Sequence, residues 1–326
     1  MILTALVAAR FLHFASLAAA LGAALALLGR DSGLRSLTAL RAWARRALIL
    51  SAALALTTAI LLLGATAANL SGTPSGAWDS AMLSTIVQET EFGRVWVVRL
   101  TMAALLLGVA ALAVRRARRT AADAASALLA LGLLASLALT GHAAVQGGAE
   151  GLTHRLANAV HLIAAGVWLG SLPPFLFMLR QGNSGEPANV ALAAERLAAF
   201  HTIGLAAVLA LGATGLVNSW FLVRTPANLL TTSYGLLLTA KLVLFAAMVA
   251  LAADNRLRLV PNLRIRGSGE EAALAAQRVR ASIGAEWLLG LLLLVAVALL
   301  GVMEPAASDP RTGSCAYPCR VPHAVP

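Results

Sequence analysis

The chain has 326 residues, of which 60% are hydrophobic and only 12% charged, and its formal net charge is +11. A soluble domain of this length cannot bury so much apolar surface, so the composition excludes an ordinary water-soluble protein. The positive charge does not indicate nucleic-acid binding, because the arginines gather between apolar stretches, as they do in membrane proteins.

Eight apolar stretches follow one another along the chain, and each is about long enough to cross a hydrocarbon layer of ~30 Å. They are apolar around most of their circumference rather than along one stripe, which argues against helices of a soluble core. We therefore predict an all-α, polytopic integral membrane protein with eight transmembrane helices. The predicted spans are residues 3–28, 47–67, 95–114, 124–140, 156–179, 198–222, 234–252 and 283–302.

The segments between the spans alternate in charge. Those after the first, third and seventh spans are rich in arginine, whereas the segment after the second span holds Asp79, Glu89 and Glu91. Arginine-rich loops remain in the cytoplasm, so both termini are predicted to lie outside it. The first span has no basic region before it, and we interpret it as a retained helix rather than a cleaved signal peptide.

The two halves of the chain resemble each other. His13 and His161 each stand eight residues before a Leu-Gly pair, and Leu-Gly-Ala-Thr occurs at residues 63–66 and again at 211–214. Both matches have the same offset of 148 residues. Four helices are an even number, so two such units in tandem would enter the membrane in the same direction, as a parallel repeat.

The third helices of the two units agree as well, with Arg99-Leu100 matching Lys241-Leu242 at an offset of 142 residues. The fourth and eighth helices match only loosely. We predict two four-helix membrane units and a tail outside the cytoplasm, at residues 1–145, 146–304 and 305–326.

Four of the six histidines are predicted to lie in the outer half of the membrane. His142 ends the fourth helix, His154 follows in the outer loop, and His161 lies just inside the fifth helix; the repeat gives His13 a similar depth. An ionisable side chain inside a span usually has a function or a buried partner. Imidazole suits copper, zinc, iron and nickel, so these four histidines are the candidate metal ligands. A polar residue hydrogen-bonded between helices is the alternative for each of them.

Sulfur ligands for a copper site are also available on the outer side. Met82 and Met303 are predicted there, and Cys315 and Cys319 lie in the tail after the last span. In an oxidising compartment the two cysteines are expected to form a disulfide, and a thiolate copper site with His323 is the alternative.

Three basic residues, Arg10, Arg99 and Lys241, fall inside spans with hardly an acidic partner in reach. Their side chains can snorkel toward the membrane surface. Alternatively they receive an anion, such as a haem propionate or a lipid headgroup. The second possibility keeps open a b-type cytochrome in which His13 and His161 are axial haem ligands.

Several sequence runs resemble the CopD copper-resistance membrane protein family, mainly between His142 and Pro261. The resemblance implies an inner-membrane protein that handles copper, often as a presumed importer working with a periplasmic CopC-type copper-binding protein. His142 and His161 are the positions whose surroundings match the family pattern. The runs are Thr140-Gly141-His142-Ala143, residues 161–170, Tyr234-Gly235 with Lys241, and Asp254-Asn255-Arg256-Leu257.

We predict from these observations a copper permease that takes copper at the outer histidines and passes it between the two halves. Met178 and Met248 are the only soft ligands in the inner half. A haem-binding cytochrome and a copper-binding assembly factor that does not transport are the alternatives. The sequence has no Walker, dinucleotide, zinc-protease or nucleophile-elbow motif, so no enzyme activity is expected. The expected partners are the bilayer, the CopC-type protein and a second copy of the chain, but no nucleic acid.

Overall fold

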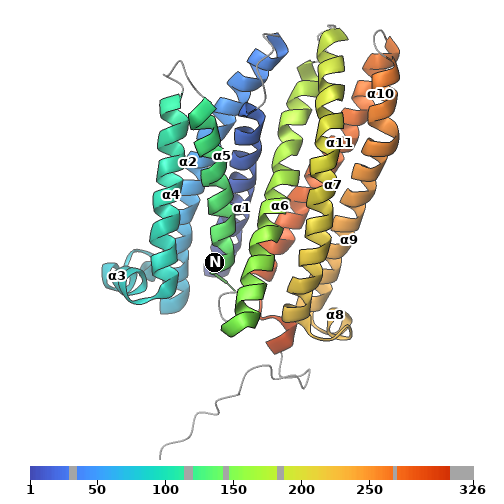
Figure 1. Cartoon of the computed structure of the whole chain (residues 1–326). Helices are drawn as coiled ribbons and strands as arrows, with labels where there is room; N and C mark the ends of the chain where they lie inside the picture. The colour runs from blue at the N-terminus through green and yellow to red at the C-terminus, as the bar shows by residue number, and fades with distance from the viewer. Residues whose placement is uncertain (29–34, 114–119, 142–146, 182–186, 267–269, 309–326) are drawn as a thin grey trace, which may run out of the picture.

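The computed structural model describes residues 1–28, 35–113, 120–141, 147–181, 187–266 and 270–308, and this part of the chain is helical without any strand (Figure 1). A π-helical stretch at Asn255–Leu259 joins α9 to α10 without a break. The α-helices are α1 (Ile2–Leu27), α2 (Arg35–Ser71), α3 (Ser80–Glu89), α4 (Glu91–Ala113), α5 (Thr120–Ser136), α6 (Gly148–Gln181), α7 (Pro187–Val223), α8 (Asn228–Thr231), α9 (Ser233–Asp254), α10 (Val260–Arg266) and α11 (Glu270–Leu300).

Within the described residues, eight helices are long and apolar enough to cross a membrane, which confirms the predicted all-α class and the number of spans. They are α1, α2, α4, α5, α6, α7, the continuous helix formed by α9 and α10, and α11. The chain is therefore a multi-pass membrane protein.

Several helices begin well before the predicted spans. The apolar stretch predicted at residues 47–67 belongs to a helix that begins at Arg35, and the last span belongs to a helix that begins at Glu270. Hydropathy marks only the part of a helix inside hydrocarbon, whereas backbone hydrogen bonding continues through polar turns beyond it. Arg41 and Arg45, predicted in a connecting segment, accordingly lie on α2.

The eight long helices form two groups that stand side by side (Figure 1). One contains α1, α2, α4 and α5, and the other contains α6, α7, α9 and α11; α1 packs against α6 where the groups meet. We call the end that holds the N-terminus, α3 and α8 the α8 end, and the opposite one the α10 end (Figure 1). Most described arginines lie toward the α10 end, among them Arg41, Arg45, Arg46, Arg180, Arg258, Arg264, Arg278 and Arg280.

The two groups of helices touch through glycine. A Cβ atom added to Gly22 of α1 would overlap the carbonyl oxygen of Gly170 of α6, and one added to Gly170 would overlap the carbonyl oxygen of Ala18. Small residues allow this close approach of backbones between membrane helices. Gly22 and Gly170 are also the pair that the predicted 148-residue offset equates. The repeat and its domain boundaries remain predictions.

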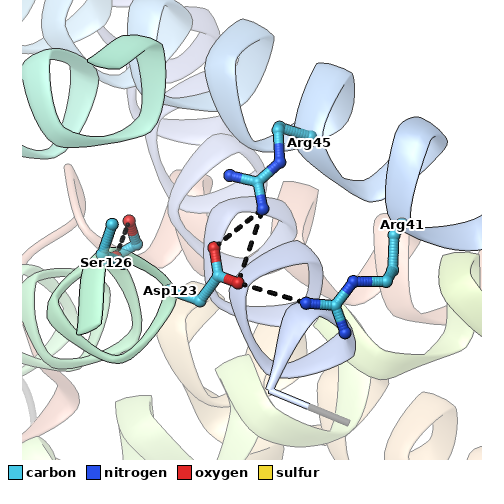
Figure 2. Close-up of polar contacts among 5 residues, drawn as sticks. Arg41, Arg45, Asp123 and Ser126 are labelled. Carbon is cyan, nitrogen blue, oxygen red and sulfur yellow. Dashed lines mark hydrogen bonds and ion pairs between the residues drawn. The ribbon is translucent and has the colours of Figure 1, made fainter. Parts of the chain in front are cut away.

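A buried ion pair joins α2 to α5 toward the α10 end (Figure 2). The carboxylate of Asp123 accepts from Nη2 of Arg45 at 3.1 and 3.4 Å, and Nη2 of Arg41 lies 3.5 Å from it. Asp123 is 1% exposed and Arg45 is 7% exposed. Charges this deeply buried are tolerated when they are paired and hydrogen-bonded, and this contact links α5 to α2, although α5 packs mainly on α1 and α4.

Candidate functional site

The two groups of helices are packed differently. In the first, α2 packs on α4, and Nε1 of Trp96 on α4 donates to the backbone carbonyl of Ala59 on α2 at 3.1 Å. In the second, the corresponding helices α7 and α9 stand apart, and Leu238 occupies the position that the 142-residue offset equates with Trp96. Leucine has no side-chain donor and cannot make this bridge.

A cavity of about 780 Å³ lies between these separated helices, toward the α8 end of the second group. Residues of α1, α6, α7, α9 and α11 line it. Leu216 and Trp220 of α7 and Leu242 of α9 also line it, yet they are 76%, 65% and 45% exposed. The cavity therefore opens sideways between α7 and α9, at a surface that faces the hydrocarbon of a membrane. Its volume lies in the range of small-molecule sites.

His161 lines this cavity in an orientation suited to a metal ligand. Its Nδ1 lies 3.0 Å from Oγ1 of Thr214 on α7, and that hydroxyl donates its only hydrogen to the carbonyl oxygen of Ala210. The ring nitrogen must therefore be the donor, which places the proton on Nδ1 and leaves the lone pair of Nε2 available. Ligating histidines are usually oriented by such a hydrogen bond from the other ring nitrogen.

His13 makes the same kind of contact in the first group. Its Nδ1 lies 3.0 Å from Oγ1 of Thr58, whose hydroxyl donates to the carbonyl oxygen of Leu54. Its Nε2 is buried and has no hydrogen-bond partner among the described residues. His13 is fully buried, however, and is not one of the residues that line the cavity. The structure thus does not bring His13 and His161 together around one cavity, and nothing in it supports the haem alternative.

His154 lines the same cavity as His161, two turns earlier on α6, and its ring stacks on Phe221 with the centroids 4.7 Å apart. His142 lies outside the described residues, as do the cysteines and the histidine of the tail. Gly141, the residue before His142, lines the cavity.

Met248 on α9 is buried and is the one methionine among the described residues that line this cavity. Met82 on α3 and Met303 after α11 are not among the cavity residues. No group of three or more histidine, cysteine, aspartate or glutamate side chains that could hold a metal occurs among the residues described. Among the described lining residues, the imidazole and sulfur donors are therefore two histidines and one methionine.

The charged residues around the cavity are all basic. Arg10, Lys241 and Arg224 line it, and no aspartate or glutamate is among its described lining residues. Arg99, which the sequence analysis grouped with Arg10 and Lys241, lies elsewhere. It donates to the carbonyl oxygen of Ser136 at 2.8 Å, and its guanidinium carbon lies 4.3 Å from the ring centre of Trp96.

A buried carboxylate lies beyond the wall of the cavity, toward the α10 end. Glu286 of α11 is 2% exposed and accepts from Nε1 of Trp168, itself a cavity residue, at 2.5 Å. Nδ2 of Asn255 donates to the other carboxylate oxygen at 3.2 Å. No role was predicted for Glu286 from the sequence, although an acidic residue inside a span was the available signal.

Comparisons with known proteins agree on one family. A family model described as "Copper resistance protein D-like, N-terminal domain" matches residues 1–152, and another described as "Copper resistance protein D" matches residues 194–300. No solved structure matches the chain significantly.

Three curated proteins are similar to the chain. Copper resistance protein D of Pseudomonas syringae pv. tomato is 34% identical over 68% of this chain and 71% of its own. Inner membrane protein YebZ of Escherichia coli (strain K12) is 32% identical over 92% of this chain and 98% of its own. Copper transport protein CutJ of Bacillus subtilis (strain 168) is 28% identical over 72% of this chain but only 41% of its own.

Proposed function

Because the chain belongs to the copper resistance protein D family, we propose that it is a copper permease of the bacterial inner membrane, and a carrier rather than an enzyme. Copper enters the cavity between α7 and α9 and binds to the histidines of α6. The proposal is supported by the name of the copper transport relative and by the donor set around the cavity.

One observation carries the choice of site. The hydroxyl of Thr214 holds the proton of His161 on Nδ1, so that Nε2 has its lone pair available in the cavity. His154, two turns away on α6, and Met248 of α9 line other parts of the cavity and supply a further imidazole and a thioether along it. Imidazole and thioether together favour copper, and the soft thioether favours Cu(I). The basic lining opposes the binding of any cation, but it repels monovalent Cu(I) half as strongly as divalent Cu(II).

The orientation of the protein follows from its arginines. Since most of them lie toward the α10 end, we place that end in the cytoplasm and the α8 end, with both termini, in the periplasm. A periplasmic CopC-type protein would then deliver copper at the α8 end. Trp168 of the cavity wall donates to Glu286, which also accepts from Asn255, and copper would leave past these polar groups toward the cytoplasm. Release by rocking of the two helix groups is the accompanying hypothesis.

Uptake of Cu(I) into proteoliposomes tests the proposal with His161→Ala and His154→Ala. His201→Ala is the matched control, because His201 on α7 is not a cavity residue. We expect the control to transport normally and both cavity variants to lose most of their uptake. Unchanged uptake in His161→Ala would reject the site. Copper binding without any uptake by the wild type would instead identify an assembly factor that does not transport.

Thr214→Val tests whether the hydrogen bond between His161 and Thr214 orients the imidazole for copper binding. The substitution keeps the shape of the side chain but removes the oxygen that orients His161, so we expect copper affinity to fall roughly 10–100-fold. Thr58→Val is the matched control, because it removes the same contact from His13, outside the cavity. Titration of each purified variant with Cu(I) against a competing chelator measures the effect. Equal losses in the two variants would contradict a site at His161.

A further inference from the structure

The described residues that line the cavity carry positive charges and no negative charge. Nε of Arg10 and Nε of Arg224 are buried and have no hydrogen-bond partner among the described residues, and no described acidic residue pairs with Lys241. Arg10, Arg224 and Lys241 are half-buried, and a charge partly withdrawn from water without a counter-charge is unfavourable. The arrangement therefore favours a ligand that carries negative charge.

Arg224 is placed at the cavity by an unusual backbone. Its φ of 66° makes it the only non-glycine residue with positive φ in the described part of the chain. The carbonyl oxygen of Val223 holds this turn by accepting from the amide of Thr225 at 2.8 Å and from Nδ2 of Asn228 at 2.9 Å. Left-handed backbone is unfavourable for arginine and is often found at ligand sites.

The basic groups lie where a lipid headgroup can reach them. A Cβ atom added to Gly301, directly after the end of α11, would lie 2.9 Å from Nη2 of Arg10, so this guanidinium is level with the α8 end. Arg224 directly follows the end of α7. Lys241 is deeper, eight residues into α9, which corresponds to about 12 Å along the helix.

The rest of the cavity suits an apolar body. Phe14, Leu162, Leu238 and Phe245 are among its lining residues, and its side opening between α7 and α9 faces hydrocarbon. A free anion in water would have to cross this apolar opening or come from the α8 end. A lipid can instead slide its acyl chains through the opening while its headgroup remains at the α8 end.

We propose that the cavity binds one phospholipid with a net negative headgroup, whose phosphate lies among Arg10, Lys241 and Arg224 and whose acyl chains leave between α7 and α9. This ligand is distinct from copper, and its binding does not depend on the proposed permease activity. Charge-assisted hydrogen bonds from arginine and lysine are the usual means of holding a phosphate. The negative charge of the phosphate also offsets part of the positive charge of the described lining residues.

The experiment is native mass spectrometry of the full chain, delipidated in neutral detergent and titrated with dioleoyl phosphatidylglycerol. Dioleoyl phosphatidylcholine has the same chains but a headgroup without net charge, and inorganic phosphate has the charge without the chains. We expect one phosphatidylglycerol per protein, bound at least about tenfold more tightly than phosphatidylcholine. Equal binding of the two lipids, or binding of inorganic phosphate as tight as that of phosphatidylglycerol, would overturn the proposal.

Variants locate the site. Lys241→Gln and Arg10→Gln should each weaken phosphatidylglycerol binding about tenfold, the equivalent of one charge-assisted contact, and leave phosphatidylcholine binding unchanged. Lys241→Arg should retain binding, which separates loss of charge from loss of folding. Arg94→Gln is the matched control, because Arg94 is exposed on α4 and pairs only loosely with Glu91 at 4.0 Å. Equal binding by Lys241→Gln and Arg94→Gln would reject the assigned site.

Discussion

Replacing Asp123 with alanine removes the carboxylate that joins α2 to α5. Arg45, 7% exposed, would then be buried without a counter-ion, and breaking a buried pair in this way costs about 3–5 kcal/mol. The contact with Arg41 adds at most about 1 kcal/mol, because the side chain of Arg41 is 22% exposed. We therefore expect Asp123→Ala to lower the free energy of unfolding by about 3–5 kcal/mol.

Equilibrium unfolding in mixed detergent micelles, followed by circular dichroism, measures this loss. The double variant Asp123→Leu/Arg45→Met leaves no unpaired charge in this pair, so it should cost less than the single variant. Glu91→Ala removes one partner of an exposed pair and should change stability by less than about 1 kcal/mol. A loss below about 1 kcal/mol for Asp123→Ala, or an equal loss in the double variant, would refute the reasoning.

Two further substitutions test contacts inside the helix bundle. Gly22→Ala forces a methyl group into the backbone of Gly170 and should lower the free energy of unfolding by about 1–3 kcal/mol. Gly108→Ala is the control, because a methyl group there meets nothing within 4 Å. In the same unfolding assay it should be neutral or stabilise α4 by up to about 1 kcal/mol. Trp168→Phe removes the donor to the buried carboxylate of Glu286 and should cost about 1.5–3 kcal/mol, measured as a lower free energy of unfolding; no loss would show that this hydrogen bond contributes little.

The fold was largely predictable because a membrane imposes one simple rule on each span. A spanning helix must form all its backbone hydrogen bonds internally and be apolar for about 20 residues. Both properties can be predicted from a short stretch of sequence. The ends of α2 and α11 were missed because their first turns are polar and lie outside the apolar window.

The site was predictable only in part. His161 was predicted inside the fifth span and His154 in the outer loop; both lie on α6 and line one cavity, while their role as metal ligands remains a prediction. The presence of histidine inside a span could not separate His161 from His13, since both make the same threonine contact and differ in what surrounds their Nε2 atoms. That difference depends on the separation of α7 from α9, which arises from tertiary packing. Glu286 was missed for the same reason, because its partners come from α6 and from the π-helical stretch.

The contact between Gly22 and Gly170 also limits how the molecule can change shape. Because it joins backbone to backbone, α1 and α6 are in closest contact at this point, and a rotation about it would displace the two glycines least. They cannot approach further, since the backbones already touch. Any opening and closing of the cavity between α7 and α9 that involves whole helix groups would therefore be a rotation about a pivot inside the membrane, with the largest displacements at the two ends of the helices.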